Sequence, residues 1–110
     1  MKVIDLAIYR KARVSFSESQ EGNGRYDGHI NFEVFWPNAN PDYEYALADS
    51  QIKSAIEKFK IQTGQTVYFT GFGTWEKFSI MYIKKKDVKK YSEIMCRLLK
   101  EELITADISA

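Results

Sequence analysis

The alternating segment HINFEVFW, residues 29–36, constrains the fold of this chain more than any other feature. Apolar side chains occupy every second position in it: Ile30, Phe32, Val34 and Trp36. Successive side chains of a β-strand point to opposite faces, so this period of two predicts a strand with one apolar face. The polar Asn31 and Glu33 fall on the opposite face. Such a strand has to pair with a neighbour and bury its apolar face against a second layer.

The earlier segment RVSFSES, residues 13–19, is the expected partner of this strand, because a glycine-rich connection joins the two. A two-residue turn in that connection would place Phe16 opposite Asn31 and mix apolar with polar side chains on one face. A shift of one residue places Phe16 opposite Phe32 instead, and such a shift moves every side chain of a strand to its other face. We therefore predict the second register, with an odd number of loop residues and a β-bulge at Gly24.

Two later segments show the period of amphipathic helices. In residues 47–64 the apolar stripe consists of Ile52, Ala55, Ile56 and Phe59. In residues 87–104 it consists of Val88, Tyr91, Ile94, Met95, Leu98 and Leu99. Asp49 or Ser50 is the expected N-cap of the first helix, and Gly64 is its expected C-cap. Each helix therefore has one apolar face to pack against the sheet.

The segment TVYFTGFGTWEK, residues 66–77, invites comparison with a phosphate-binding loop. A P-loop needs two glycines at a wider spacing, a following Lys and Ser or Thr, and a strand that leads into a helix. Here the spacing is wrong, and apolar alternation on both sides predicts two strands. A type II′ turn at Gly71-Phe72 explains the first glycine and keeps Phe69 on the same face as Phe78. We therefore predict a β-hairpin.

The order of these elements predicts a single α+β domain over residues 1–110. We expect an antiparallel sheet of four to five strands with two helices packed on one face, in the order (β)ββαββα. The bracketed strand stands for residues 2–12, KVIDLAIYRKA, which the sequence leaves open as strand or helix.

Composition narrows the classes of function. The formal net charge of +1 gives no field strong enough for general nucleic-acid binding, although it leaves room for a local basic patch. Cys96 is the single cysteine, so no internal disulfide forms, and a reducing, cytoplasmic setting is expected. No apolar run approaches the roughly 20 residues that span a bilayer, so we expect no contact with a membrane.

We expect no enzyme, no cofactor and no metal, because residues for such chemistry are scarce. His29 is the single histidine, and together with Asp27 it supplies too few ligands for a metal site. Cys96 follows Met95 on the last predicted helix, where a buried structural thiol is the expected role.

Aromatic residues form the first candidate site. Trp and Tyr are enriched in the hot spots of protein interfaces. The loop WPNANPDYEY, residues 36–45, and the outer face of the hairpin hold the predicted partner-binding residues: Trp36, Tyr43, Tyr45, Tyr68 and Trp75. The alternative is that the rings of the loop pack over the edge of the sheet.

The segment KKKDVKKY, residues 84–91, is the second candidate site. The predicted nucleic-acid-binding residues are Lys84, Lys85, Lys86, Lys89, Lys90 and Tyr91. Lysines neutralise phosphates and release counterions, and Tyr91 and the earlier Tyr82 would add stacking surface. The alternative is a solvated junction between a strand and a helix, where lysines serve solubility.

These observations predict a small non-enzymatic binding module. A protein–protein role, as an adaptor or as an inhibitor of a larger complex, is the first expectation, because the chain is 15% aromatic and nearly neutral. Nucleic-acid binding through the lysine cluster is the alternative. A homodimer through a sheet edge or the last helix is also expected, since small domains bury surplus apolar area in this way.

Overall fold

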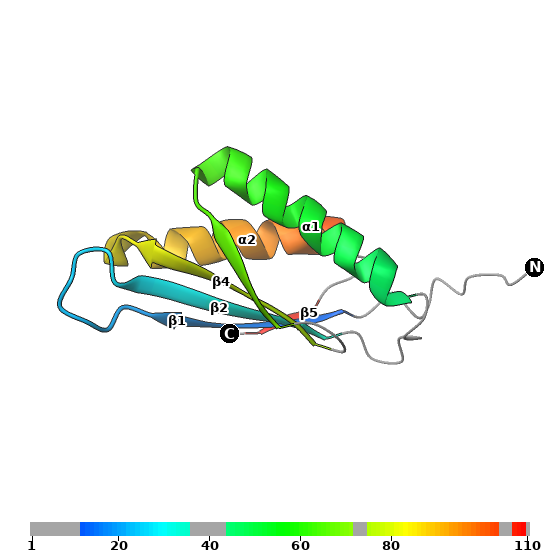
Figure 1. Ribbon diagram of the computed structural model, residues 1–110, viewed down its shortest axis with the longest axis horizontal. Helices are drawn as coiled ribbons and strands as arrows, with labels where there is room; N and C mark the ends of the chain where they lie inside the picture. Colours follow the sequence, from blue (N-terminus) through cyan, green and yellow to red (C-terminus); the bar gives the residue numbers. More distant parts are fainter. Residues whose placement is uncertain (1–11, 36–43, 72–74, 104–106, 110) are drawn as a thin grey trace, which may run out of the picture.

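The computed structural model describes residues 12–35, 44–71, 75–103 and 107–109, and within these ranges it leaves out the side chains of residues 44–49, 71, 75, 107 and 109 (Figure 1). Its elements in chain order are β1 (Arg13–Ser19), β2 (Gly28–Phe35), α1 (Glu44–Thr63), β3 (Val67–Gly71), β4 (Trp75–Ile83), the short 3₁₀ turn η2 (Lys85–Asp87), α2 (Val88–Glu102) and β5 (Asp107–Ser109). The α+β class is confirmed. Residues 2–11 of the uncertain first segment lie outside the described part.

The sheet has the strand order β3-β4-β2-β1-β5. The first four strands are antiparallel, whereas β5 runs parallel to β1 and pairs with Arg13–Ser15. The sequence did not predict this fifth strand, which comes from the C-terminal end of the chain. Three residues are too few to display an alternating pattern, and only the tertiary fold brings them to the edge of β1.

The predicted register of β1 and β2 is confirmed. Phe16 lies opposite Phe32, and their stacked rings have centroids 5.8 Å apart. The loop between the paired Ser19 and His29 has an odd number of residues, as expected. The predicted bulge at Gly24 is wrong, because Gly24 lies inside this loop. A loop of this length reverses the chain without an extra residue in either strand.

Both helices cover the same face of the sheet (Figure 1). The core lies between these layers, and the sheet contributes Val14, Ile30, Phe32, Val34, Phe78 and Ile80 to it. The helices contribute Ile52, Ala55, Phe59, Val88, Met95, Leu98 and Leu99. Phe32 and Phe78 stack at the centre with centroids 5.2 Å apart. Removing either ring would cost roughly 3–5 kcal/mol, the usual range for Phe→Ala in a core.

Helix α1 begins at Glu44, so the predicted N-cap at Asp49 or Ser50 is wrong. The three residues before Asp49 are Ala, Leu and Ala, which have high helix propensity and extend the helix past that cap. The predicted C-cap is confirmed. Gly64 has a φ of +73°, and its N–H donates to the carbonyl of Lys60 at 2.8 Å.

Polar contacts join the two helices and tie α2 to the sheet. The ammonium of Lys58 on α1 donates to the carboxylate of Glu102 on α2, and this bond raises the pKa of Lys58. The buried hydroxyl of Ser92 on α2 donates to the Glu18 carboxylate on β1 at 2.5 Å. Neither described helix combines the length and the apolar character needed to cross a bilayer.

Candidate functional site

The first candidate surface is the face of the sheet opposite the helices, which we call the helix-free face. Its described side chains include Ser15, Ser17, Asn31, Glu33, Tyr68, Lys77 and Ser79, and the same register adds Arg13, Ser19, His29 and Phe35. They lie on this face because strand side chains alternate, and their apolar neighbours occupy the core. No described helix or strand packs on it.

Cross-strand pairing arranges these side chains in two rows. One row runs from Tyr68 on β3 through Ser79 and Asn31 to Ser17 on β1. In this row the Ser79 hydroxyl donates to Oδ1 of Asn31 at 2.6 Å.

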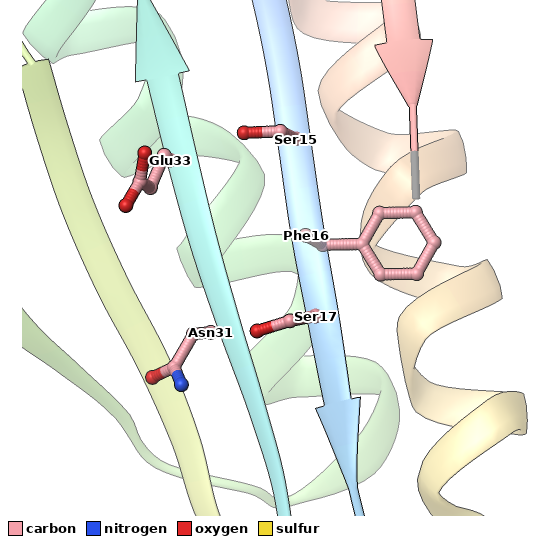
Figure 2. Close-up of a pocket in the computed structure, with 5 residues that line it drawn as sticks. All are labelled: Ser15, Phe16, Ser17, Asn31 and Glu33. Carbon is pink, nitrogen blue, oxygen red and sulfur yellow. The ribbon is translucent and has the colours of Figure 1, made fainter.

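The second row contains Lys77, Glu33 and Ser15. In it the Lys77 ammonium lies 3.8 Å from the Glu33 carboxylate, and both side chains are about half exposed. A shallow depression of about 200 Å³ lies between β1 and β2. Figure 2 shows the polar ends of Ser15, Asn31 and Glu33 directed one way across it, while the ring of Phe16 points the other way.

The structure places one of the five predicted partner-binding side chains. Tyr68 lies on the helix-free face with 40% of its surface exposed. Tyr45 and Trp75 belong to α1 and β4, but their side chains lie outside the described part. Trp36 and Tyr43 lie outside the described residues altogether. The predicted aromatic set therefore stays a prediction, except for the position of Tyr68.

The second candidate surface is the lysine cluster, which begins where β4 ends and continues into the first turn of α2. Lys85 holds the β1–β2 loop against this junction. Its ammonium donates to the carbonyl of Gly22, and its backbone N–H donates to the carbonyl of Arg25 at 3.2 Å. The backbone of Arg25, a cation in the loop, therefore lies beside Lys85. We call Arg25 and the five lysines together the basic end.

The side chains of the basic end differ in their exposure to solvent. Lys86, Lys89 and Lys90 are exposed, whereas Lys84 and Lys85 are partly buried. Tyr91 is partly buried, and its ring meets the Phe59 ring edge-on with centroids 6.0 Å apart. That packing leaves less of the Tyr91 ring for stacking on a ligand than the sequence suggested.

Tyr82 has an unusual backbone conformation, because it lies at a β-bulge. Ile80 pairs with Ile30, while Ile83 pairs with Gly28, so two residues of β4 correspond to His29 alone. This bulge returns Ile83 to the core after Ile80. It also gives Tyr82 a φ of 61°, which is uncommon for a residue with a bulky side chain, and leaves 72% of its surface exposed.

The exposed tyrosine borders a hollow that we call the tyrosine hollow, of about 270 Å³. The side chains that line it are Ser19, Glu21, Tyr26, Asp27, His29, Met81 and Tyr82. Tyr26 is 51% exposed, and the Arg25 guanidinium lies 5.8 Å from its ring centroid. Nε2 of His29 is buried without a hydrogen-bond partner in the described part of the chain.

The Cys96 thiol lacks the lowered pKa of a catalytic nucleophile. Burial, with smaller effects from Glu18 and Glu93, raises the pKa of the Cys96 thiol to about 11, so it is protonated at neutral pH. His29 shares a face with Asn31, whereas Cys96 belongs to a helix on the opposite face. Among the described residues, no group of three or more His, Cys, Asp or Glu side chains is placed to hold a metal ion.

Comparisons with protein-family models, with curated proteins and with solved structures found no match to this chain.

Sequence reasoning missed Arg25 and Tyr26. It named Tyr82 as stacking surface beside the lysines but did not predict the bulge at which Tyr82 lies. One signal for Tyr82 is visible in the sequence. The apolar spacing changes from two residues, between Phe78 and Ile80, to three, between Ile80 and Ile83. A change of that kind within a strand is the mark of a bulge. No comparable signal exists for Arg25, because it approaches the lysines only through the folded loop.

Proposed function

We propose that the protein is a small non-catalytic binding module, and that its partner is another protein that docks on the helix-free face. The observation that carries this proposal is the arrangement of Tyr68, Ser79, Asn31 and Ser17 in one row across four strands. It offers a tyrosine at one end and hydroxyl and amide groups along its length. Non-obligate protein interfaces combine such tyrosines with polar, hydrogen-bonding surroundings.

The partner surface that fits this face is polar. Ser15, Ser17 and Asn31 present donors and acceptors, and the Lys77–Glu33 pair adds one charge of each sign. A surface rich in hydroxyl, amide and backbone groups would match them, whereas a large apolar patch would leave them unpaired at a cost. An adaptor or an inhibitor of a larger complex acts through contacts of this kind. The lone cysteine makes a reducing compartment such as the cytoplasm our proposed location.

Affinity capture with matched variants tests this proposal. Ser17→Arg and Tyr68→Ala alter the helix-free face, while Glu57→Arg alters an exposed position on α1 and serves as the control. We expect the wild type and the control to capture the same protein from a lysate of the native host, and both face variants to lose it. The captured protein is then purified, and its Kd for each variant is measured. Equal binding by all four proteins would overturn the proposal.

A second candidate function is nucleic-acid binding at the basic end. The observation in its favour is that Lys85 holds the loop in place, so that the loop segment with Arg25 lies beside the lysine segment. The exposed Lys86 and Lys90 are available to phosphates. Each phosphate neutralised releases counterions, so binding should weaken steeply as salt rises.

Charge reversal tests this second candidate. Lys86→Glu with Lys90→Glu should abolish binding to nucleic acid at low salt. The control is Lys60→Glu with Lys100→Glu, which changes the net charge equally at exposed positions of α1 and α2 outside the basic end. If both double variants lose affinity to the same extent, only the net charge matters and the basic end is not a site.

The homodimer remains a prediction. In the described part of the sheet no strand pairs with the outer edge of β3, which has no charged residue. Edges of this kind are open to pairing with a second copy. Light scattering tests this prediction, and a monomer at high protein concentration would refute it.

A further inference from the structure

We propose that the tyrosine hollow holds an unpaired base of a single-stranded nucleic acid, between the rings of Tyr26 and Tyr82. This inference rests on the second candidate function, because the basic end would hold the phosphates on either side of that base. It adds two predictions that the lysines alone do not make: a preference for single strands and a dependence on two named rings.

The first support is the exposed position of Tyr82 at a residue with positive φ. A positive φ costs a non-glycine residue about 1–2 kcal/mol, and Gly or Asn would reduce that cost at a bulge. Tyr82 occupies the position nevertheless, with 72% of its surface exposed. The bulge itself has a structural reason, since it returns Ile83 to the core. It does not require an aromatic side chain at the strained position.

The second support is the shape of the tyrosine hollow. Tyr26 from the β1–β2 loop and Tyr82 from β4 both border it, and Met81 also lines it. Ligand pockets for drug-sized molecules begin at about 300 Å³. At about 270 Å³ this hollow suits a fragment such as one planar base. Aromatic side chains recognise unpaired bases by stacking, whatever the sequence.

The third support is the polar lining. His29 borders the hollow with a buried Nε2 that has no partner in the described part of the chain. Oδ2 of Asp27 already accepts from the N–H of Gly24 at 2.6 Å, which fixes its carboxylate at the rim. The Asp27 carboxylate suits an N–H of a neutral base, whereas Nε2 of His29 is shielded from solvent by the surrounding chain. Asp27 and Glu21, which also lines the hollow, would repel a phosphate, and the basic end would hold it instead.

The loop connects the two parts of the proposed site. Lys85 donates to two carbonyls of the β1–β2 loop, and the same loop carries Tyr26. The Arg25 guanidinium lies 5.8 Å from the Tyr26 ring centroid, so a cation and a stacking surface are adjacent. One strand could therefore place its base in the tyrosine hollow and its flanking phosphates on Arg25 and Lys86.

The test compares a labelled single-stranded 12-mer of mixed sequence with the duplex of the same sequence, each at low salt, using fluorescence anisotropy. A ribonucleotide 12-mer of that sequence separates RNA from DNA. Tyr82→Asn removes the ring but tolerates positive φ, and Tyr82→Phe keeps the ring. Tyr26→Ala removes the second ring. Ile61→Ala removes an exposed large side chain from α1, outside every proposed site, and is the control.

We expect single strands to bind more tightly than the duplex. Tyr82→Asn and Tyr26→Ala should each weaken single-strand binding by at least about fivefold, the lower end of what one stacked base contributes. Tyr82→Phe, which keeps the ring, should bind much more tightly than Tyr82→Asn, and Ile61→Ala should bind as the wild type does. Duplex binding should respond to the lysine variants alone.

Two negative results have different meanings. If single strand and duplex bind equally and the tyrosine variants have no effect, the inference is overturned while the basic end remains a phosphate site. If neither nucleic acid binds at low salt, both the inference and the second candidate function are overturned.

Discussion

Ser79 on β4 donates its hydroxyl hydrogen bond to Oδ1 of Asn31 on β2 at 2.6 Å, on the face of the sheet that the helices leave open. Ser79 is only 2% exposed, although no described helix lies above it. Its small side chain lies in the middle of the row, between Tyr68 and Asn31. The open face is therefore organised by polar contacts between strands, and a docking partner would meet side chains that already hold fixed positions.

Ser79→Ala should lower the free energy of unfolding by about 1 kcal/mol, the usual net contribution of one hydrogen bond. The loss stays small because Asn31 is exposed and water can replace the hydroxyl. Urea denaturation measures the change. Ser17→Ala, at an exposed position of the same row, should change stability by less than about 0.5 kcal/mol. Equal effects at the two positions would show that the hydrogen bond does not stabilise the sheet.

Tyr82→Gly should raise the free energy of unfolding by up to about 1 kcal/mol, because it relieves the positive φ at the cost of a more flexible unfolded chain. The lost ring costs little, since it is mostly exposed. Tyr68→Gly is the comparison. Tyr68 lies in an ordinary strand, where glycine should destabilise by roughly 0.5–1 kcal/mol. Thermal unfolding of both variants checks the difference in sign, and destabilisation by Tyr82→Gly would mean that the ring itself stabilises the fold.

The backbone register could be predicted from the sequence because it follows from a repeated pattern. Phe16 and Phe32 belong to strands that each alternate, and one slip would bury polar groups, so a single pairing satisfies both segments. The fifth strand could not be predicted, because three residues carry no period and its position depends on where α2 ends.

For the candidate site, too, the sequence predicts one part and misses another. The lysines were visible as a cluster in the sequence, since they are neighbours along the chain. The tyrosine hollow depends on the approach of the β1–β2 loop to β4, and contacts between distant segments leave no trace in a local pattern. The aromatic set of Trp36 and Tyr43 stays untested, because these residues lie outside the described part.

Cys96 should react slowly with iodoacetamide near neutral pH, because the pKa of its thiol is raised to about 11 from its ordinary value of 9.0. The rate should rise as pH increases through about 11, whereas the urea-unfolded chain should titrate near 9. Between these values the folded protein holds more protons than the unfolded chain, so stability should fall as pH rises. Mass spectrometry of the alkylated protein follows the reaction. A folded-state midpoint near 9 would contradict the burial of this thiol.

Lys85→Met should loosen the β1–β2 loop without removing the aliphatic stem of the side chain. The ammonium bond to Gly22 would be lost, while the backbone bond from Lys85 to Arg25 would remain. We therefore expect a modest loss of stability, of about 1 kcal/mol, and faster hydrogen exchange at the amides of Gly24 and Asp27. Lys86→Met removes an equal charge from an exposed neighbour and should leave that exchange unchanged. If Lys85→Met also weakens single-strand binding more than Lys86→Met does, the ammonium of Lys85 acts by positioning Tyr26 as well as by its charge.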